Sequence, residues 1–315
     1  MDGLHDIAAT DGMAFRSMVD TPMQRSLRSA ICCVGTGLHS GRQVQVTLRP
    51  AASGAGIVFL RTDLDKAIPA RFDLVADTRL CTVLALPGQP AARVGTVEHL
   101  MAALSACGIG NVVVELDGPE VPVLDGSSAE WLFLLDCAGV VTLDVPTPVI
   151  QVVRPVRVQD GDAWAELRPS AGSGLDMAMS IEFAAPAIGR QALSLPLDEH
   201  GFRTVLGHAR TFVQAHEVAG LRAAGLAQGG SLDNAVVVDG AQILNPAGLR
   251  CPDEFVRHKM LDAVGDLALA GAALQGRFIG HRSGHAVNNL LLRSLFSDAA
   301  NWRDAPVPAW SRAAA

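Results

Sequence analysis

The residues best suited to chemistry lie in segment 257–266, which reads Arg-His-Lys-Met-Leu-Asp-Ala-Val-Gly-Asp. On a helix, His258 and Asp262 stack about 5–6 Å apart on one face, because residues at positions i and i+4 are neighbours there. An imidazole and a carboxylate at that spacing can bind one cation, and Asp266 continues the row one turn later. A solvated His–Asp pair on a helix surface is the alternative. The strongly apolar face beside this polar row favours the metal site.

A metal site of this kind needs a further ligand from elsewhere in the chain, because catalytic zinc usually takes three protein ligands and leaves a position for water. Among the nine histidines, His99 is distinctive, since Glu98 precedes it at the start of an expected helix. A glutamate beside a metal-binding histidine can take the proton of the metal-bound water. A surface Glu–His pair is the alternative interpretation of these two residues.

Composition limits the class of protein. The chain has 315 residues, of which 49% are hydrophobic and 18% charged, so we expect folded domains, two at the usual ~100–200 residues each. A net charge of −7 without a basic block argues against broad nucleic-acid binding. No apolar run approaches the ~18–20 residues of a membrane span, and the N-terminus has no secretory apolar region. Six cysteines without a C-x-x-C pair indicate reduced thiols and a cytoplasmic protein.

The chain partly repeats itself. Residues 44–51 alternate apolar and polar as a half-buried strand does, end in Leu-Arg-Pro-Ala, and are followed by a second strand from 57–60. Residues 163–170 alternate likewise, end in Leu-Arg-Pro-Ser, and are followed by an apolar run at 177–183. The shared tract could arise by chance, but duplication of an α+β unit explains it better.

Each half then ends in helical sequence. Residues 96–107 have helical apolar spacing with Thr96 placed to cap, and a strand follows at 111–116; residues 253–273 form the second predicted helix. Because strands and helices are mixed rather than strictly alternating, we predict an α+β fold. Two prolines in 144–148 indicate a linker. The predicted division is a tail at 1–23, a first domain at 24–144, a second domain at 149–297, and a tail at 298–315.

An ordered series of motifs carries a family resemblance. These motifs are 24–27 (QRSL), 35–41 (GTGLHSG), 48–50 (LRP), 96–104 (TVEHLMAAL), 119–127 (PEVPVLDGS), 209–212 (ARTF), 229–235 (GGSLDNA), 258–266 and 283–289 (SGHAVNN). With them, residues 24–295 resemble the UDP-3-O-acyl-N-acetylglucosamine deacetylases, the zinc enzymes of bacterial lipid A synthesis. The resemblance implies two similar domains, each a sheet layered with helices (the ribosomal S5 domain 2-like sandwich), facing each other across the active site.

The resemblance also implies the roles of individual residues. His99, His258 and Asp262 would hold one zinc ion per chain. Glu98 would be the general base, the Thr211 hydroxyl would help to hold the oxyanion, and a cationic His285 would stabilise that anion and help to protonate the leaving amine. The remaining implied residues are Asp266, which would orient His285; Lys259 and Phe212, which would contact substrate; and Cys81, a thiol near the metal or a buried structural thiol.

The implied substrate is a small molecule with a diphosphate, a sugar and a fatty acyl chain. An acidic protein then needs a local cationic patch, for which Lys259, one of only two lysines, is suited. Phe212 and residues 213–226 are candidates for an acyl channel, where Val213-Gln214 departs from the family pattern. We expect a monomer, no nucleic-acid partner and at most transient membrane contact. The alternatives are a zinc amidohydrolase acting on a different N-acylated substrate, or a binding protein with an inactive site.

Overall fold

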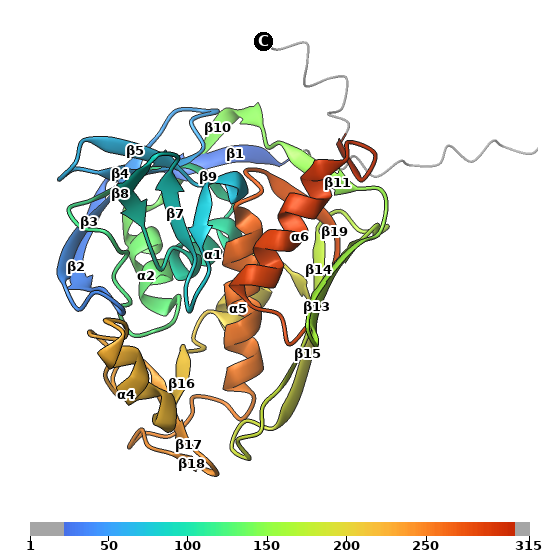
Figure 1. Cartoon of the computed structure of the whole chain (residues 1–315). Coiled ribbons are helices and arrows are strands. Elements are labelled where there is room, and N and C mark those ends of the chain that lie inside the picture. Colours follow the sequence, from blue (N-terminus) through green and yellow to red (C-terminus); the bar gives the residue numbers. More distant parts are fainter. Residues whose placement is uncertain (1–21, 306–315) are drawn as a thin grey trace, which may run out of the picture.

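The computed structural model describes residues 22–305, and they form two similar halves, each a seven-stranded sheet with helices (Figure 1). The α+β class and the duplication expected from the sequence are therefore confirmed. Within residues 22–305, the longest apolar helices are too short or too polar to cross a membrane.

The first half contains a large sheet, a small sheet and two helices. The large sheet contains β1 (Met23–Leu27), β2 (Ile31–Thr36), β3 (Gln43–Pro50), β4 (Ile57–Arg61), β5 (Lys66–Pro69), β9 (Ile109–Leu116) and β10 (Val140–Pro146). The small sheet contains β6 (Val75–Asp77), β7 (Val83–Leu86) and β8 (Gln89–Val94), preceded by the 3₁₀ turn η1 (Phe72–Leu74). The helices are α1 (Glu98–Ala106) and α2 (Ala129–Ala138).

The second half is built in the same way around a different small sheet. Its large sheet contains β11 (Val149–Val152), β12 (Val156–Asp160), β13 (Ala163–Arg168), β14 (Leu175–Glu182), β15 (Arg190–Leu197), β19 (Ala273–His281) and β20 (Trp302–Asp304). Its small sheet contains β16 (Phe212–Gln214), β17 (Val236–Asp239) and β18 (Gln242–Ile243). The helical segments are α3 (Glu199–Gly201), η2 (Phe202–Leu206), α4 (Ala215–Ala223), α5 (Glu254–Ala268) and α6 (His285–Ser297).

The two large sheets share one strand order, which is β10-β1-β9-β3-β2 in the first half and β20-β11-β19-β13-β12 in the second. Each sheet also contains a hairpin, β4–β5 or β14–β15. The first strand of the hairpin, β4 or β14, pairs in parallel with the central strand of the sheet, β9 or β19. The repeated tracts 44–51 and 163–170 correspond to β3 and β13, which hold the same place in the two strand orders. Alternate residues are buried in β3, whereas three consecutive residues are buried in β13. The repeated tract therefore marks equivalent strands.

The ends of the chain differ from the predicted tails. Residues 302–304 form β20, which pairs with β11 in the second sheet, so the prediction of a tail throughout 298–315 is wrong there. Met23, expected in the N-terminal tail, begins β1, and β10 continues into the predicted linker as far as Pro146. Because β20 is a short edge strand, its residues alone carry little pattern. The remaining tail predictions, for 1–21 and 306–315, lie outside the described residues.

Two details of the predicted helices are also wrong. Helix α5 ends at Ala268 rather than at 273, since a turn with Gly271 at φ +79° leads into β19. Thr96 does not cap α1: its hydroxyl donates to Glu120 Oε1 at 2.9 Å, and the helix begins two residues later at Glu98.

Helices α1 and α5 lie side by side between the two large sheets (Figure 1), and their buried side chains belong to one core cluster. At their crossing Gly265 faces the start of α1. A Cβ atom on Gly265 would overlap the backbone carbonyl group of Glu98. The missing side chain therefore lets the two helices approach closely at the point where α1 carries Glu98 and His99.

Replacing Gly265 with alanine is expected to lower the free energy of unfolding by about 1–3 kcal/mol, the usual cost of overpacking. Activity should fall as well, because the added methyl group displaces Glu98 and His99. The matched control is Gly220→Ala in α4, where a Cβ atom would meet open space and helix propensity favours alanine. Urea unfolding of both variants tests this, and unchanged stability in Gly265→Ala would contradict the close approach.

Candidate active site

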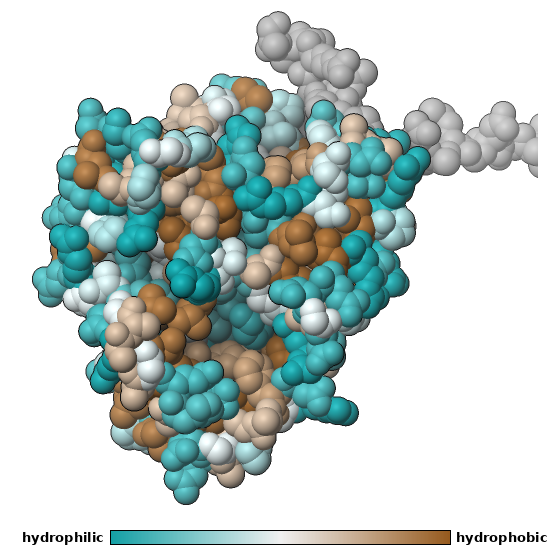
Figure 2. Space-filling model, in the orientation of Figure 1, coloured by the Kyte–Doolittle hydropathy of each residue, from teal (hydrophilic) through white to brown (hydrophobic). Residues whose placement is uncertain are grey.

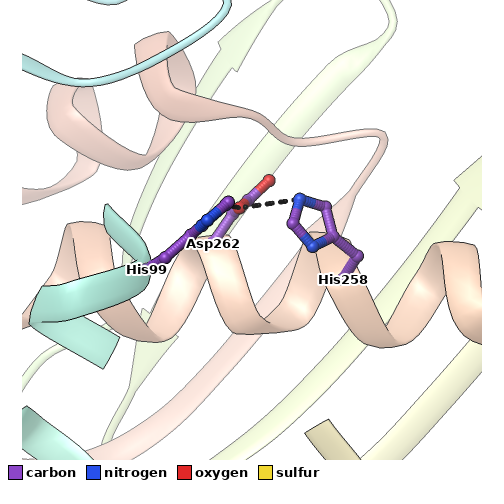
Figure 3. A group of neighbouring side chains, drawn as sticks. All are labelled: His99, His258 and Asp262. Atoms are coloured by element: carbon purple, nitrogen blue, oxygen red, sulfur yellow. Dashed lines mark ion pairs between the residues drawn. The ribbon is translucent and has the colours of Figure 1, made fainter. Parts of the chain in front are cut away.

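Three buried side chains from the two halves converge at the crossing of α1 and α5. His99 comes from α1, and His258 and Asp262 come from α5; one ligand atom of each lies within 4.8 Å of the others (Figure 3). His258 Nε2 is 3.3 Å and His99 Nε2 is 3.6 Å from Asp262 Oδ1. The i, i+4 pair expected from the sequence thus meets a histidine from the other half.

The electrostatics of this cluster suit a metal ion. Burial lowers the pKa of His258 to about 4, so the ring is neutral and can act as a ligand. Its Nδ1 lies 3.0 Å from the carbonyl oxygen of Ala209, an arrangement that leaves the Nε2 lone pair facing Asp262. Burial disfavours ionised Asp262, but His258 and Lys259 outweigh it and hold the pKa of the carboxyl well below its usual range. Two imidazoles and a carboxylate form a donor set that catalytic zinc uses.

Glu98 lies beside the cluster in the first turn of α1. Its side chain is almost fully buried; Thr82 donates its backbone N–H to Oε2 at 3.1 Å, and Oε1 lies 3.8 Å from His285 Nε2. Burial raises the pKa of the Glu98 carboxyl, and His285 and His99 oppose this effect. A buried carboxylate with a raised pKa is suited to accept a proton near neutral pH.

His285 and Asp266 form a buried pair. His285 Nδ1 lies 2.9 Å from Asp266 Oδ2, and Thr82 and Asn288 also donate to this carboxylate. Burial alone lowers the pKa of His285, but Asp266 and Glu98 outweigh burial and raise it to about 9. His285 is therefore cationic at neutral pH.

Lys259 contacts a carboxylate of the cluster. Its Nζ donates to Asp262 Oδ2 at 2.8 Å, and its side chain is mostly buried. Burial disfavours the charged amine, yet Asp262 outweighs this and raises the pKa of Lys259. The ammonium group is therefore charged, and it neutralises part of the cluster.

Thr211 and Phe212 line a cavity of about 250 Å³ beside α4. Its walls are mainly apolar, and they include Val213, where the sequence departs from the family pattern, and Leu80 from the first half. Figure 2 shows hydrophobic surface beside the hollow next to α4. Cys81 is buried, and burial together with the nearby Glu98 carboxylate raises the pKa of its thiol.

Sequence reasoning missed several residues that hold the site together. Glu254 accepts two hydrogen bonds from the Arg210 guanidinium and one from the Arg210 backbone N–H. These bonds hold the irregular segment that leads through Thr211 into β16. Thr82 and Asn288 donate to Asp266. Arg210 lies inside the 209–212 motif and Asn288 inside the 283–289 motif, which were usable signals, whereas Thr82 lies in none of the quoted motifs.

Taken together, the geometry defines a candidate metal centre with an adjacent carboxylate and imidazole, which can serve metal-assisted hydrolysis. A family model described as UDP-3-O-acyl N-acetylglycosamine deacetylase matches residues 24–297. The chain therefore belongs to this deacetylase family.

Relatives that carry the name of this family match about nine tenths of the chain. The UDP-3-O-acyl-N-acetylglucosamine deacetylase of Phenylobacterium zucineum (strain HLK1) is 47% identical over 89% of this chain and 95% of the relative. That of Idiomarina loihiensis is 44% identical over 92% of this chain and 98% of the relative. The deacetylase of Chromobacterium violaceum is 46% identical over 89% of this chain and 92% of the relative.

Proposed function

We propose that this protein is a zinc-dependent deacetylase that removes acetate from UDP-3-O-[(3R)-3-hydroxyacyl]-N-acetylglucosamine, the committed step of lipid A biosynthesis. The observation that carries the proposal is the convergence of His99, His258 and Asp262 from two halves, with Glu98 alongside. Membership of the deacetylase family supports the substrate.

The three clustered side chains would hold one zinc ion per chain. Bound there, zinc supplies Lewis acidity, which activates a water molecule and polarises the acetamide carbonyl. The neutral His258 ring and the ionised Asp262 support this role, since a metal ligand must offer a lone pair that no proton occupies.

Glu98 would take the proton of the attacking water. Its carboxylate is oriented by the backbone N–H of Thr82, and its raised pKa suits proton transfer at neutral pH. Cationic His285 would stabilise the oxyanion and donate a proton to the leaving amine, while Asp266 orients the ring through Nδ1. The Thr211 hydroxyl, on the cavity wall, would donate to the same oxyanion.

The cavity beside α4 would receive the acyl chain. Its apolar walls, with Phe212 and Val213, suit a hydrocarbon. Lys259, the cation beside Asp262, would contact the polar part of the substrate. A monomer in the cytoplasm, with no nucleic-acid partner and at most transient membrane contact, completes the proposal; six free cysteines support a reducing compartment.

A deacetylation assay with chelation and zinc rescue tests the proposal. Acetate should be released from the UDP-sugar substrate but not from simple N-acetylglucosamine, should cease after chelation, and should return with zinc. Release only from a different N-acylated compound would favour another zinc amidohydrolase. Binding of zinc and substrate without turnover would identify a binding protein with an inactive site.

His285→Gln is expected to lower kcat by about 10² while zinc is retained, because glutamine can neither carry the charge nor donate the proton. In the wild-type protein the imidazolium loses its proton as pH rises through about 9, so the rate should decline on the alkaline side. This decline should be absent in His285→Gln. His200→Gln, at an exposed position, should behave as the wild type; a change in His285→Gln confined to KM would contradict the oxyanion role.

A further inference from the structure

Thr82 touches two carboxylates that belong to different halves of the molecule. It lies just before β7, and only 1% of its surface is exposed. Its backbone N–H donates to Glu98 Oε2 at 3.1 Å, and its hydroxyl donates to Asp266 Oδ1 at 2.6 Å. One residue of the first half thus links α1 to α5 through its backbone and its side chain.

These contacts complete a ring of four residues that includes His285. The imidazole meets Asp266 through Nδ1 at 2.9 Å and faces Glu98 through Nε2 at 3.8 Å. Thr82 donates to the same two carboxylates. The relative placement of Glu98 and His285 therefore depends on Thr82 as well as on the packing of the helices.

The hydroxyl of Thr82 also restricts the orientation of the Asp266 carboxylate. Oδ1 accepts from Thr82, and Oδ2 accepts from Asn288 Nδ2 at 2.8 Å and from His285 Nδ1. A carboxylate with donors on both oxygens cannot turn without breaking one of these bonds. Its plane, and with it the direction of the His285 ring, is then set before substrate binds.

We propose that Thr82 is a positioning residue for the reaction. Its hydroxyl fixes the orientation of Asp266, and Asp266 in turn fixes His285 in place relative to Glu98. This inference rests on the proposed function. Thr82 acts through its neighbours rather than on substrate.

The side chain can be tested separately from the backbone. Thr82→Val has nearly the same shape and keeps the N–H that donates to Glu98, so it removes only the hydrogen bond to Asp266. Thr82→Ser keeps the hydroxyl and removes a methyl group, and it is the matched control. A role in packing alone would make serine the more harmful substitution.

The test compares zinc-loaded wild type, Thr82→Val and Thr82→Ser in steady-state deacetylation of the UDP-sugar substrate, with zinc content measured in each. We expect kcat to fall roughly tenfold to a hundredfold in Thr82→Val, the size expected for loss of a buried hydrogen bond to a charged group. KM and zinc content should stay within about twofold of wild type, the signature of an interaction that acts on the chemical step. Thr82→Ser should retain most of the wild-type kcat.

A second measurement does not depend on activity. Proton NMR should show a downfield Nδ1 proton of His285, assigned by its absence in His285→Gln, that is sharp in wild type and Thr82→Ser. In Thr82→Val it should broaden or disappear, because Asp266 is free to turn. Equal kcat and an unchanged resonance in Thr82→Val, or equal losses in both variants, would overturn the inference. Wild type without deacetylase activity would refute the proposed function, and the resonance would then decide on the positioning role by itself.

Discussion

Asp262→Ala is expected to remove zinc from the protein and to reduce deacetylation to the background rate. Asp262 is the anion of the cluster: both imidazoles and the Lys259 ammonium lie within 3.6 Å of its oxygens. Without this carboxylate, no negative charge in the cluster would offset the zinc ion and the buried Lys259 ammonium group. Metal analysis of protein purified without chelator should fall from about one zinc per chain, as for a three-ligand site, to almost none.

The control for this substitution is Asp253→Ala, at the start of the same helix. Asp253 pairs with Arg257 at 2.7 Å and is partly exposed, so its loss should leave zinc content unchanged. His99→Ala should lose zinc as Asp262→Ala does, although it comes from the other half. Full zinc in both ligand variants would refute the ligand set.

Glu98→Gln is expected to retain zinc and to lose activity by about 10²–10⁴, the range for a general base. The amide oxygen of glutamine can still accept the N–H of Thr82, so the surroundings change little, but glutamine cannot take a proton from water. Steady-state rates, zinc content and unfolding midpoint together separate this effect from damage to the site.

The matched control is Glu115→Gln in β9, a glutamate paired with Arg49 at 2.7 Å. Because partly exposed ion pairs contribute little to stability, this variant should turn over at nearly the wild-type rate. If Glu98→Gln did so as well, Glu98 would not be the general base, and another group would have to accept the proton.

Local patterns were sufficient for much of the architecture. The alternation in 44–51 and 163–170 predicted β3 and β13, and the helical spacing after Asp253 predicted α5, because burial on one face imposes a period of two on strands and of 3.6 on helices. The edge strand β20 was missed. At three residues, it is too short to display a period, and its pairing with β11 depends on residues about 150 positions earlier in the chain.

At the site, the sequence by itself determined the pair His258 and Asp262, since i, i+4 neighbours on one helix meet regardless of the rest of the fold. The resemblance to a known family, rather than spacing, predicted His99 as their partner. Only the tertiary structure decided that His99 lies 3.6 Å from Asp262 and that Thr82 joins Glu98 to Asp266. These contacts join residues of two halves, brought together by the packing of α1 on α5, and no local period of the chain encodes such a distance.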